Sequence, residues 1–366
     1  MDKYERMPLT SFTQPVENVT LLSQCPRWLM NTSQNLTTVY GPNAWDILAD
    51  LKGEQETNTA LRAEVNQIQD LGYMRKNVDT VFILAPGASL SMYQDMLPAL
   101  ESRGYVLVSP TVMPWLGHQT GAWPDGVVVV DGNPASVEYA RMSGIAENSG
   151  AVLMMTPEAP PQMPVVFGRE RTYWFRTSIP GPHGEPDWEP YAVFQGLLCQ
   201  VIKTRIVQLG CVTNMMVALA LALRDYAGWQ FKRIVLVGAD YGYWNGLARV
   251  PFDGSNKLQP FDPENRSNFL MPSLMNPGLE MWTDRRMARY KASLMLVWMQ
   301  SKEPIYSMSH GILDELPQVT ADNVLADAYP EYPNEKEVHD RIVRWMRWFQ
   351  KESGLIRVDE DGGITA

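Results

Sequence analysis

From residue 78 onward, short apolar runs alternate with amphipathic segments. The apolar runs are rich in β-branched side chains and end in small or polar residues, which is typical of buried strands. They cover Val78–Leu84, Tyr105–Ser109, Gly126–Val130, Ala151–Met154, Arg233–Val237 and Pro304–Ser307. The amphipathic segments have helical spacing and cover Ser91–Ser102, Ala135–Asn148, Val212–Tyr226, Met281–Gln300 and Asn334–Lys351. This alternation predicts an α/β fold, a mostly parallel sheet with helices on both faces.

The two ends of the chain have a different texture. Residues 1–76 are polar and mixed, and their apolar spacing predicts helices over Ala44–Leu51 and Glu56–Leu71. We expect this part to pack on the core as an N-terminal helical cap. The central domain then spans residues 77–320, and residues 321–366 form a C-terminal helix and tail.

Residues 156–200 interrupt the alternation, because they hold many proline and aromatic residues. The stretch Ile179–Pro186 has the restricted backbone of a loop. A loop of this length is often a functional lid. A surface excursion packed by its own aromatic side chains is the alternative, and both interpretations stay open.

Composition narrows the class of protein. The chain has 366 residues, 45% of them apolar, which is enough for a large core. Its net charge of −10 and the lack of a basic block argue against nucleic-acid binding. The three cysteines, Cys25, Cys199 and Cys211, have no paired spacing and fit a reducing compartment. No signal-peptide pattern or membrane-spanning run is recognisable, so we expect a cytoplasmic protein without a membrane partner.

The first strand of the predicted sheet ends in a turn of small residues, Pro86, Gly87, Ala88 and Ser89, and an amphipathic segment follows at once. Such a turn lets a ligand approach the backbone, and the free N–H groups of a helix start can hold a phosphate. Many turns of this kind contain glycine for packing alone, so this sequence supports both interpretations equally.

Further polar residues follow other strands, at the edge where open parallel sheets bind ligands. Asp131, Gly132 and Asn133 come after the third strand, and Asp240 comes after the strand that ends at Val237. The Asp131 carboxylate could bind Mg²⁺ or a ribose hydroxyl. It could equally close an Asp-Gly turn. Asp240 would shape the cleft.

A second glycine turn, at Gly210, leads into the helix predicted from Val212. Thr213 and Asn214 stand in its first turn, where they could bind a phosphate or a base, or cap the helix. His310, after the last strand, is either a packing side chain or a general acid/base. His310 or Tyr241 would then assist proton transfer.

Four motifs carry a resemblance to a known family. They are APGASL (Ala85–Leu90), WPDGVVVVDGNP (Trp123–Pro134), the segment Leu209–Tyr243 that ends in GADYGY, and IYSMSHGIL (Ile305–Leu313). In this order they resemble the 6-hydroxymethylpterin diphosphokinase MptE-like family, which includes motility accessory factors implicated in glycosylating flagellins. The chain departs from the family pattern in three places. It has Pro-Gly in place of Gly-Pro in the first motif, Ser307 in place of asparagine, and His310.

The resemblance implies a Rossmann-like domain, distantly similar to bacterial sialyltransferases that use CMP-sugars. Those enzymes carry a catalytic histidine shortly before their last long helix, and the matching stretch here, Pro272–Thr283, has none. The diphosphokinases of the family use ATP and Mg²⁺, for which Asp131 and Asp240 would supply carboxylates.

Together these patterns predict a transferase that takes a diphosphate from ATP or a glycosyl group from a nucleotide-sugar. Pro86–Leu90 and Gly210–Asn214 would hold the phosphate or base of this small-molecule partner, with Mg²⁺ or ribose at Asp131. The alternative is a catalytically idle nucleotide-binding or interaction protein, for example phage-associated, that kept the fold.

Overall fold

The fold is described from a computed structural model. It covers residues 27, 30–39, 66–71, 78–178, 202, 204–207, 209–243, 247–249, 259–260, 268–272, 280–301, 303–353, 357–358 and 364–365. The predicted helix over Ala44–Leu51 lies outside these residues.

A seven-stranded sheet forms the centre of the molecule, and every neighbouring pair of its strands is parallel. In spatial order its strands are β13 (Ile305–Met308), β8 (Arg233–Val237), β1 (Thr80–Leu84), β2 (Tyr105–Val108), β3 (Gly126–Val129), β4 (Val152–Met155) and β5 (Thr172–Trp174). The predicted Rossmann-like α/β fold is confirmed. The predicted strand bounds agree with the observed ones to within two residues, because buried parallel strands are continuous apolar runs.

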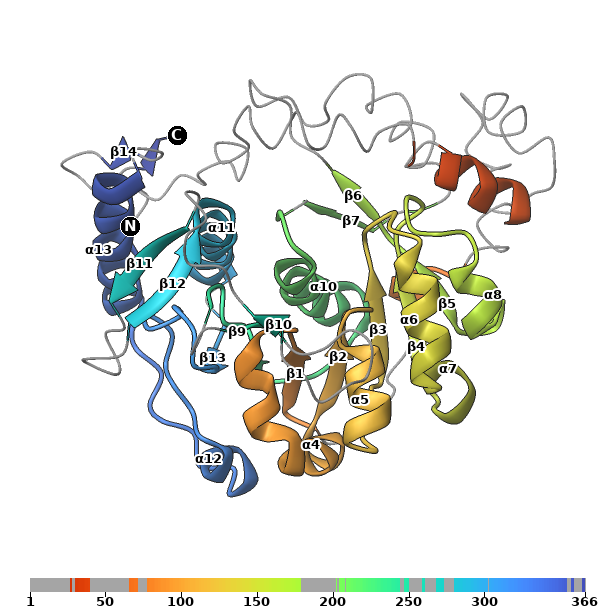
Figure 1. Ribbon diagram of the computed structural model, residues 1–366, viewed down its shortest axis with the longest axis horizontal. Coiled ribbons are helices and arrows are strands. Elements are labelled where there is room, and N and C mark those ends of the chain that lie inside the picture. The colour runs from red at the N-terminus through yellow and green to blue at the C-terminus, as the bar shows by residue number, and fades with distance from the viewer. Residues whose placement is uncertain are drawn as a thin grey trace.

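Helices cover both faces of the sheet (Figure 1), as predicted. Along β1, Val81 and Ile83 point to one face, and Phe82 and Leu84 point to the other. The first face packs against α10 (Val212–Ala227), α11 (Arg285–Ser301) and α13 (Glu335–Ser353). The second packs against η3 (Ala88–Met96), α4 (Leu97–Arg103), α5 (Met113–Gln119), α6 (Ala135–Ser143), α7 (Ile145–Asn148) and α8 (Met163–Phe167).

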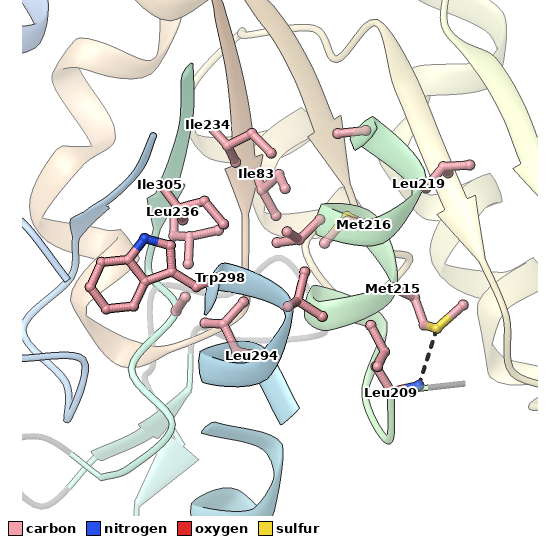
Figure 2. Close-up of a cluster of buried hydrophobic side chains, with 14 of the residues drawn as sticks. Ile83, Leu209, Met215, Met216, Leu219, Ile234, Leu236, Leu294, Trp298 and Ile305 are labelled. Atoms are coloured by element: carbon pink, nitrogen blue, oxygen red, sulfur yellow. Dashed lines mark hydrogen bonds between the residues drawn. The ribbon is translucent and has the colours of Figure 1, made fainter. Parts of the chain in front are cut away.

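Figure 2 shows the core of the first face, where α10 and α11 meet the sheet. Met216 of α10 and Leu294 of α11 are fully buried, close to Ile83 and Leu236 of the strands. Each such side chain contributes about 1.5–3 kcal/mol by leaving water. The backbone N–H of Leu209 also contacts the sulfur of Met215 at 3.4 Å, which holds the chain just before α10 against its first turn.

The helix predicted over Met281–Gln300 begins later than expected. Residues Glu280–Asp284 form β12, which pairs antiparallel with β11 (Asn268–Pro272). The helix α11 starts after Asp284, whose Oδ1 accepts the N–H of Met287 at 2.7 Å. Aspartate is a strong N-cap, so this carboxylate sets the boundary between strand and helix.

Two other helix predictions are corrected in part. The predicted helix Ala135–Asn148 divides into α6 and α7 at Gly144, whose φ of +64° suits glycine. Of the predicted helix Glu56–Leu71, residues 66–71 are described. They form a bridge to Trp174 and the single turn η2 (Ile68–Asp70) instead of an α-helix. Within the tail, β14 (Arg357–Val358) pairs antiparallel with β15 (Ile364–Thr365).

The segment predicted as a lid or excursion, 156–200, is part of the framework as far as it is described. Residues 156–178 supply α8, η4 (Arg169–Arg171), the edge strand β5, and β6 (Arg176–Ser178), which pairs with β7 (Arg205–Val207). The proline residues that suggested a loop include Pro164, which stands in the first turn of α8, where its missing N–H costs nothing. The lid stays a prediction for residues 179–200, which lie outside the described residues.

An N-terminal helix, residues 30–39, packs onto the domain. Its buried Asn31 and Asn35 donate to the carbonyl oxygens of Glu158, at 2.9 Å, and Pro157, at 2.8 Å, in the loop after β4. A helical cap was expected, although from other residues of this region. The remaining elements are β9 (Leu247–Arg249), β10 (Gln259–Pro260) and α12 (Ala321–Leu325). Across the described ranges, no helix combines the length and apolar character needed to cross a membrane.

Candidate functional site

The order of the strands identifies one place in the sheet where a ligand is expected. From β1 the chain builds β2, β3, β4 and β5 in turn on one side, and then returns to add β8 and β13 on the other side. The direction of winding therefore changes between β1 and β8. In open α/β sheets, ligands bind beyond the carboxyl ends of the strands at such a point. The residues after β1, β8 and β13 are accordingly the first to consider.

The turn after β1 packs directly on the loop after β8. The N–H of Gly87 donates to the carbonyl oxygen of Gly238 at 2.9 Å, and the N–H of Ala85 donates to that of Val237 at 2.9 Å. A Cβ on Gly87 would lie 2.2 Å from the Gly238 oxygen and 2.5 Å from the Asp240 carboxylate. Gly87 has an ordinary φ of −63°. Position 87 therefore requires glycine because two loops meet there. This close contact explains the glycine without any ligand.

The carboxylate of Asp240 occupies the anion position at the start of η3. Its Oδ2 accepts the backbone N–H of Ser89 at 2.9 Å, and its Oδ1 accepts the Ser89 hydroxyl. Both residues are buried. Burial raises the pKa of the Asp240 carboxyl, while the Ser89 donors, the N–H of His310 and the charge of its imidazole lower it. The phosphate role predicted for Ser89 is thus filled by a side chain of the protein itself.

The loop after β13 closes over Asp240 from the other side. The N–H of Ile312 donates to the Asp240 carbonyl oxygen at 2.8 Å, and Ser309 Oγ accepts the N–H of Ala239 at 2.8 Å. A Cβ on Gly311 would lie 1.9 Å from the same carbonyl oxygen. Asp240 therefore ties the loops after β1, β8 and β13 together, which gives a physical basis to its predicted role in shaping this edge.

Two aromatic rings meet beside this carboxylate. The imidazole of His310 stacks on the phenol ring of Tyr93, with centroids 6.2 Å apart and planes inclined by 22°. Both residues are half-buried. Burial, with the Asp240 charge beside it, raises the pKa of Tyr93 to about 12. Sequence reasoning missed Tyr93, because nothing in its neighbourhood distinguishes it from an ordinary residue of a surface helix.

The start of α10 lies at the same edge of the sheet. Asn214 is fully buried, and its amide donates to the carbonyl oxygens of Leu209 at 2.9 Å and Tyr290 at 2.8 Å. Its Oδ1 accepts the hydroxyl of Tyr241. Since Tyr241 follows Asp240 in the chain, these contacts connect the start of α10 to the turn after β1. The polar atoms of the Asn214 side chain are hydrogen-bonded within the protein. Its role is therefore to hold the start of α10 in position at this edge.

Tyr241 is also an internal residue. Its side chain is buried, and its backbone has a φ of +48°, which is uncommon for a residue other than glycine. Burial, with Cys211 beside it, raises the pKa of Tyr241 well above its ordinary value. A buried phenol that donates to Asn214 supports the loop and is poorly placed to exchange protons with a ligand.

The turn at Gly210 remains accessible. Gly210 is exposed, with a φ of +82°, and a Cβ there would lie 2.7 Å from the ring of Tyr290. Cys211 is the N-cap of α10 without a side-chain hydrogen bond to the helix, and it is half-buried. Thr213 is buried. Thr213 and Asn214 therefore do not stand at the N-cap position, which belongs to Cys211, the residue before the helix.

Asp131 stands apart from this group, after β3. Its Oδ1 accepts the N–H of Asn133 at 2.9 Å, and Asn133 Oδ1 accepts the N–H of Ala135 at 3.1 Å, so the predicted turn is present. The side chain of Asp131 is exposed, yet desolvation by the surrounding protein raises its pKa, which the Asn133 N–H and the charge of Arg27 oppose. Asn31 of the N-terminal helix reaches the buried Gly132, whose carbonyl oxygen accepts at 3.4 Å.

Metal ligands do not gather at this edge. Among the residues that the structure describes, no three histidine, cysteine or acidic side chains are grouped closely enough to hold a metal ion. An Mg²⁺ ion can also be held by a single carboxylate together with substrate phosphates. Asp131, which uses Oδ1 in its turn, fits that simpler arrangement.

Two further acidic groups escaped sequence reasoning. Glu158, after β4, is buried beneath the N-terminal helix, and burial raises its pKa to about 7.

Glu315 forms a buried ion pair of 2.7 Å with Lys291, which also donates to the carbonyl oxygen of Ile312 in the loop that covers Asp240. Lys291 carried a signal, because it stands on the apolar stripe of α11 with Leu294 and Trp298, at i+3 and i+7.

Comparison with known proteins gives a limited result. No protein family and no curated protein sequence matches the chain. Among solved structures, it is similar to the MAf glycosyltransferase of Magnetospirillum magneticum, with a TM-score of 0.47 and 17% identity over 81% of this chain and 49% of that one. It is also similar to the sialyltransferase CstII of Campylobacter jejuni in complex with cytidine-5'-monophosphate, with a TM-score of 0.36 and 14% identity over 71% of this chain and 90% of that one.

The chain thus spans about half the length of the first of these structures. At such identities and TM-scores, the similarities assign no ligand, reaction or residue role. The fold class rests on the strands and helices described above.

Proposed function

We propose that this protein binds a nucleotide donor at the carboxyl edge of its sheet and transfers a glycosyl group from it. The observation that carries the proposal is the meeting of the loops after β1, β8 and β13 at the switch point, tied together by the Asp240 carboxylate. Parallel sheets bind nucleotides at such points. The buried carboxylate holds three loops in one arrangement, so the edge of the sheet is preorganised. Preorganisation lowers the entropic cost of binding a ligand.

The residues divide into those that would touch the donor and those that position them. Pro86, Gly87 and His310 are half-exposed at the switch point, and Gly210 is exposed at the turn before α10. The N–H groups of that turn and of the first turn of α10 would hold a donor phosphate. Ala88, Ser89, Thr213, Asn214, Asp240 and Tyr241 are buried and would act through the backbone they hold.

Asp131, Gly132 and Asn133 would hold the ribose of the donor, or Mg²⁺ with its phosphates. The exposed carboxylate of Asp131 supports this, because one of its oxygens is engaged in the turn and the other can face a ligand. Mg²⁺ would neutralise phosphate charge when bound. Transfer of a diphosphate from ATP is the second candidate reaction, and it depends on the same carboxylate more strongly, since triphosphates usually bind with Mg²⁺.

In glycosyl transfer, an acceptor hydroxyl attacks the anomeric carbon, the bond from that carbon to the donor phosphate breaks, and the nucleotide leaves with the bonding electrons. The proton of the hydroxyl passes to a base, for which His310 is the predicted group at this edge. Positioning and electrostatic stabilisation of the leaving phosphate would supply most of the rate.

A thermal-shift panel of CMP, UDP, GDP and ATP, each with and without Mg²⁺, tests the binding step. CMP is included because a structurally similar sialyltransferase was solved with it. A ligand at about 100 times its Kd adds about 2.7 kcal/mol to the free energy of unfolding. If no nucleotide raises the melting temperature, the proposal is wrong.

A second assay separates an enzyme from an idle binding protein. The nucleotide that binds best is supplied as its sugar conjugate, and release of free nucleotide is followed over time. Release above that of a Gly210→Val variant supports an enzyme that breaks the bond between the sugar and the donor phosphate, and added acceptor sugars that speed the release support transfer. Binding without release supports the alternative of a nucleotide-binding protein that kept the fold.

A further inference from the structure

We infer that Tyr93 and His310 together form the surface on which the nucleobase of the bound nucleotide stacks. This inference rests on the proposed function. It assigns His310 to stacking against the nucleobase, in place of the proton transfer predicted for it. It also brings in Tyr93, for which the sequence suggested no role.

The geometry of this two-ring platform favours stacking of a third ring. The centroid distance of 6.2 Å and inclination of 22° belong to an offset stack, in which the two rings lie in nearly parallel, displaced planes, so that a base can continue the stack on an outer face of the pair. Both residues keep part of their surface exposed. Stacking on an aromatic side chain suits any base, because each base has a flat π-face, and it contributes a large share of nucleotide affinity.

The position of the platform matches the switch point. Tyr93 belongs to η3, which follows β1, and His310 belongs to the loop after β13, so the pair spans the carboxyl end of β8. From there a nucleotide could extend its phosphates along the sheet edge. The exposed turn at Gly210 is connected to this edge through Asn214, Tyr241 and Asp240.

A single carboxylate holds the backbone near both rings. Asp240 accepts two hydrogen bonds from Ser89 at the start of η3, and it accepts the backbone N–H of His310. Side chains held in advance lose less conformational entropy when a ligand binds. A phenol is neutral at physiological pH, so the ring of Tyr93 does not repel the nucleotide phosphates.

The experiment compares Kd values for a nucleoside monophosphate and for ribose 5-phosphate, which has the same sugar and phosphate but lacks the base. The nucleotide used is whichever of CMP, UMP, GMP and AMP binds the wild-type protein most tightly. Tyr93→Leu and His310→Leu remove the rings, while Tyr93→Phe and His310→Phe keep a flat surface. Tyr226→Leu is the matched control, because Tyr226 is an exposed tyrosine near the opposite end of α10.

Each leucine variant is expected to weaken nucleotide binding by roughly tenfold to a hundredfold and to leave ribose 5-phosphate binding unchanged. The phenylalanine variants and Tyr226→Leu are expected to bind within about twofold of the wild type. His310→Phe cannot transfer a proton, so its retained affinity separates stacking from acid/base chemistry.

Three outcomes overturn the inference. Wild-type binding with unchanged affinity in both leucine variants removes the platform while the proposed function stands. If the wild-type protein binds no nucleotide, the proposed function and the platform fall together. Should a leucine variant fail to fold, nuclear Overhauser contacts between the base protons and the His310 ring in the wild-type complex decide the matter, and their absence contradicts the stacking.

Discussion

Ser89 and Asp240 are joined by two hydrogen bonds across 151 residues of sequence. The backbone N–H of Ser89 donates to one carboxylate oxygen at 2.9 Å and its hydroxyl donates to the other. A helix start that could hold a ligand phosphate therefore already holds a carboxylate of the protein. The turn after β1 was expected to contact a ligand. Through Ser89 and Asp240 it instead helps to hold three loops in position.

Asp240→Asn should lower the free energy of unfolding by about 1.5–3 kcal/mol, because an amide offers one acceptor oxygen to donors that now bind two. Urea denaturation measures the change. Asp95→Asn is the control, since Asp95 is an exposed aspartate of the same helix η3. In a double-mutant cycle with Ser89→Ala, the two substitutions should be coupled. Additive effects would contradict the role given to this pair.

Gly87→Ala should destabilise the protein by about 1–3 kcal/mol, since its Cβ would lie 2.2 Å from the carbonyl oxygen of Gly238. Gly150→Ala offers a control, because a Cβ there meets no atom within 4 Å, and its effect should stay within about 0.5 kcal/mol. Thermal unfolding of both variants provides the comparison. Equal melting temperatures would show that the loops separate easily.

Asp131→Asn should leave folding nearly unchanged, because asparagine can also accept the N–H of Asn133 and keep the turn. If Asp131 binds ribose or Mg²⁺, nucleotide affinity should fall roughly tenfold to a hundredfold, as expected for a lost charged hydrogen bond. Calorimetric titration at matched Mg²⁺ measures this. Equal affinity in both proteins would limit Asp131 to closing its turn.

Glu158 should make stability fall as the pH rises from about 4.5 to about 7. Its carboxyl has a pKa of about 7 in the folded protein against 4.5 in the unfolded chain, so the folded state binds more protons in this window. The effect is absent below the window and fully developed above it, where it reaches about 3 kcal/mol at most.

Glu158→Gln should remove this dependence, because a neutral amide occupies the same place at every pH. Urea denaturation between pH 4 and pH 8 tests the difference between the two proteins. Glu170→Gln serves as the control, because Glu170 is exposed in the nearby turn η4. Parallel stability curves for the wild type and Glu158→Gln would rule out a neutral buried Glu158.

The sequence was sufficient for six of the seven strands of the sheet and for most of its helices, whereas the edge strand β5 lay within the segment predicted as a lid or excursion. The strands are continuous apolar runs because both faces of the sheet are buried, and helices such as α10 show a long apolar stripe. The strand β12 could not be recognised from the sequence. Its residues fit a helical pattern as well as a strand, and their pairing with β11 determines their conformation.

The sequence alone also identified the sheet edge, because residues that directly follow parallel strands lie at the same end of the sheet. It could not determine which of them face a ligand. Ser89 and Asn214 looked like binding residues and Tyr241 like a group for proton transfer, yet their polar atoms are satisfied by partners remote in sequence. Tyr93 and His310 gave no joint signal because they lie more than two hundred residues apart in the sequence, one in η3 and the other in the loop after β13, and their rings meet only in the folded protein. Local patterns thus determined the elements and their order, whereas hydrogen bonds between distant loops decided which side chains support the edge and which remain exposed on it.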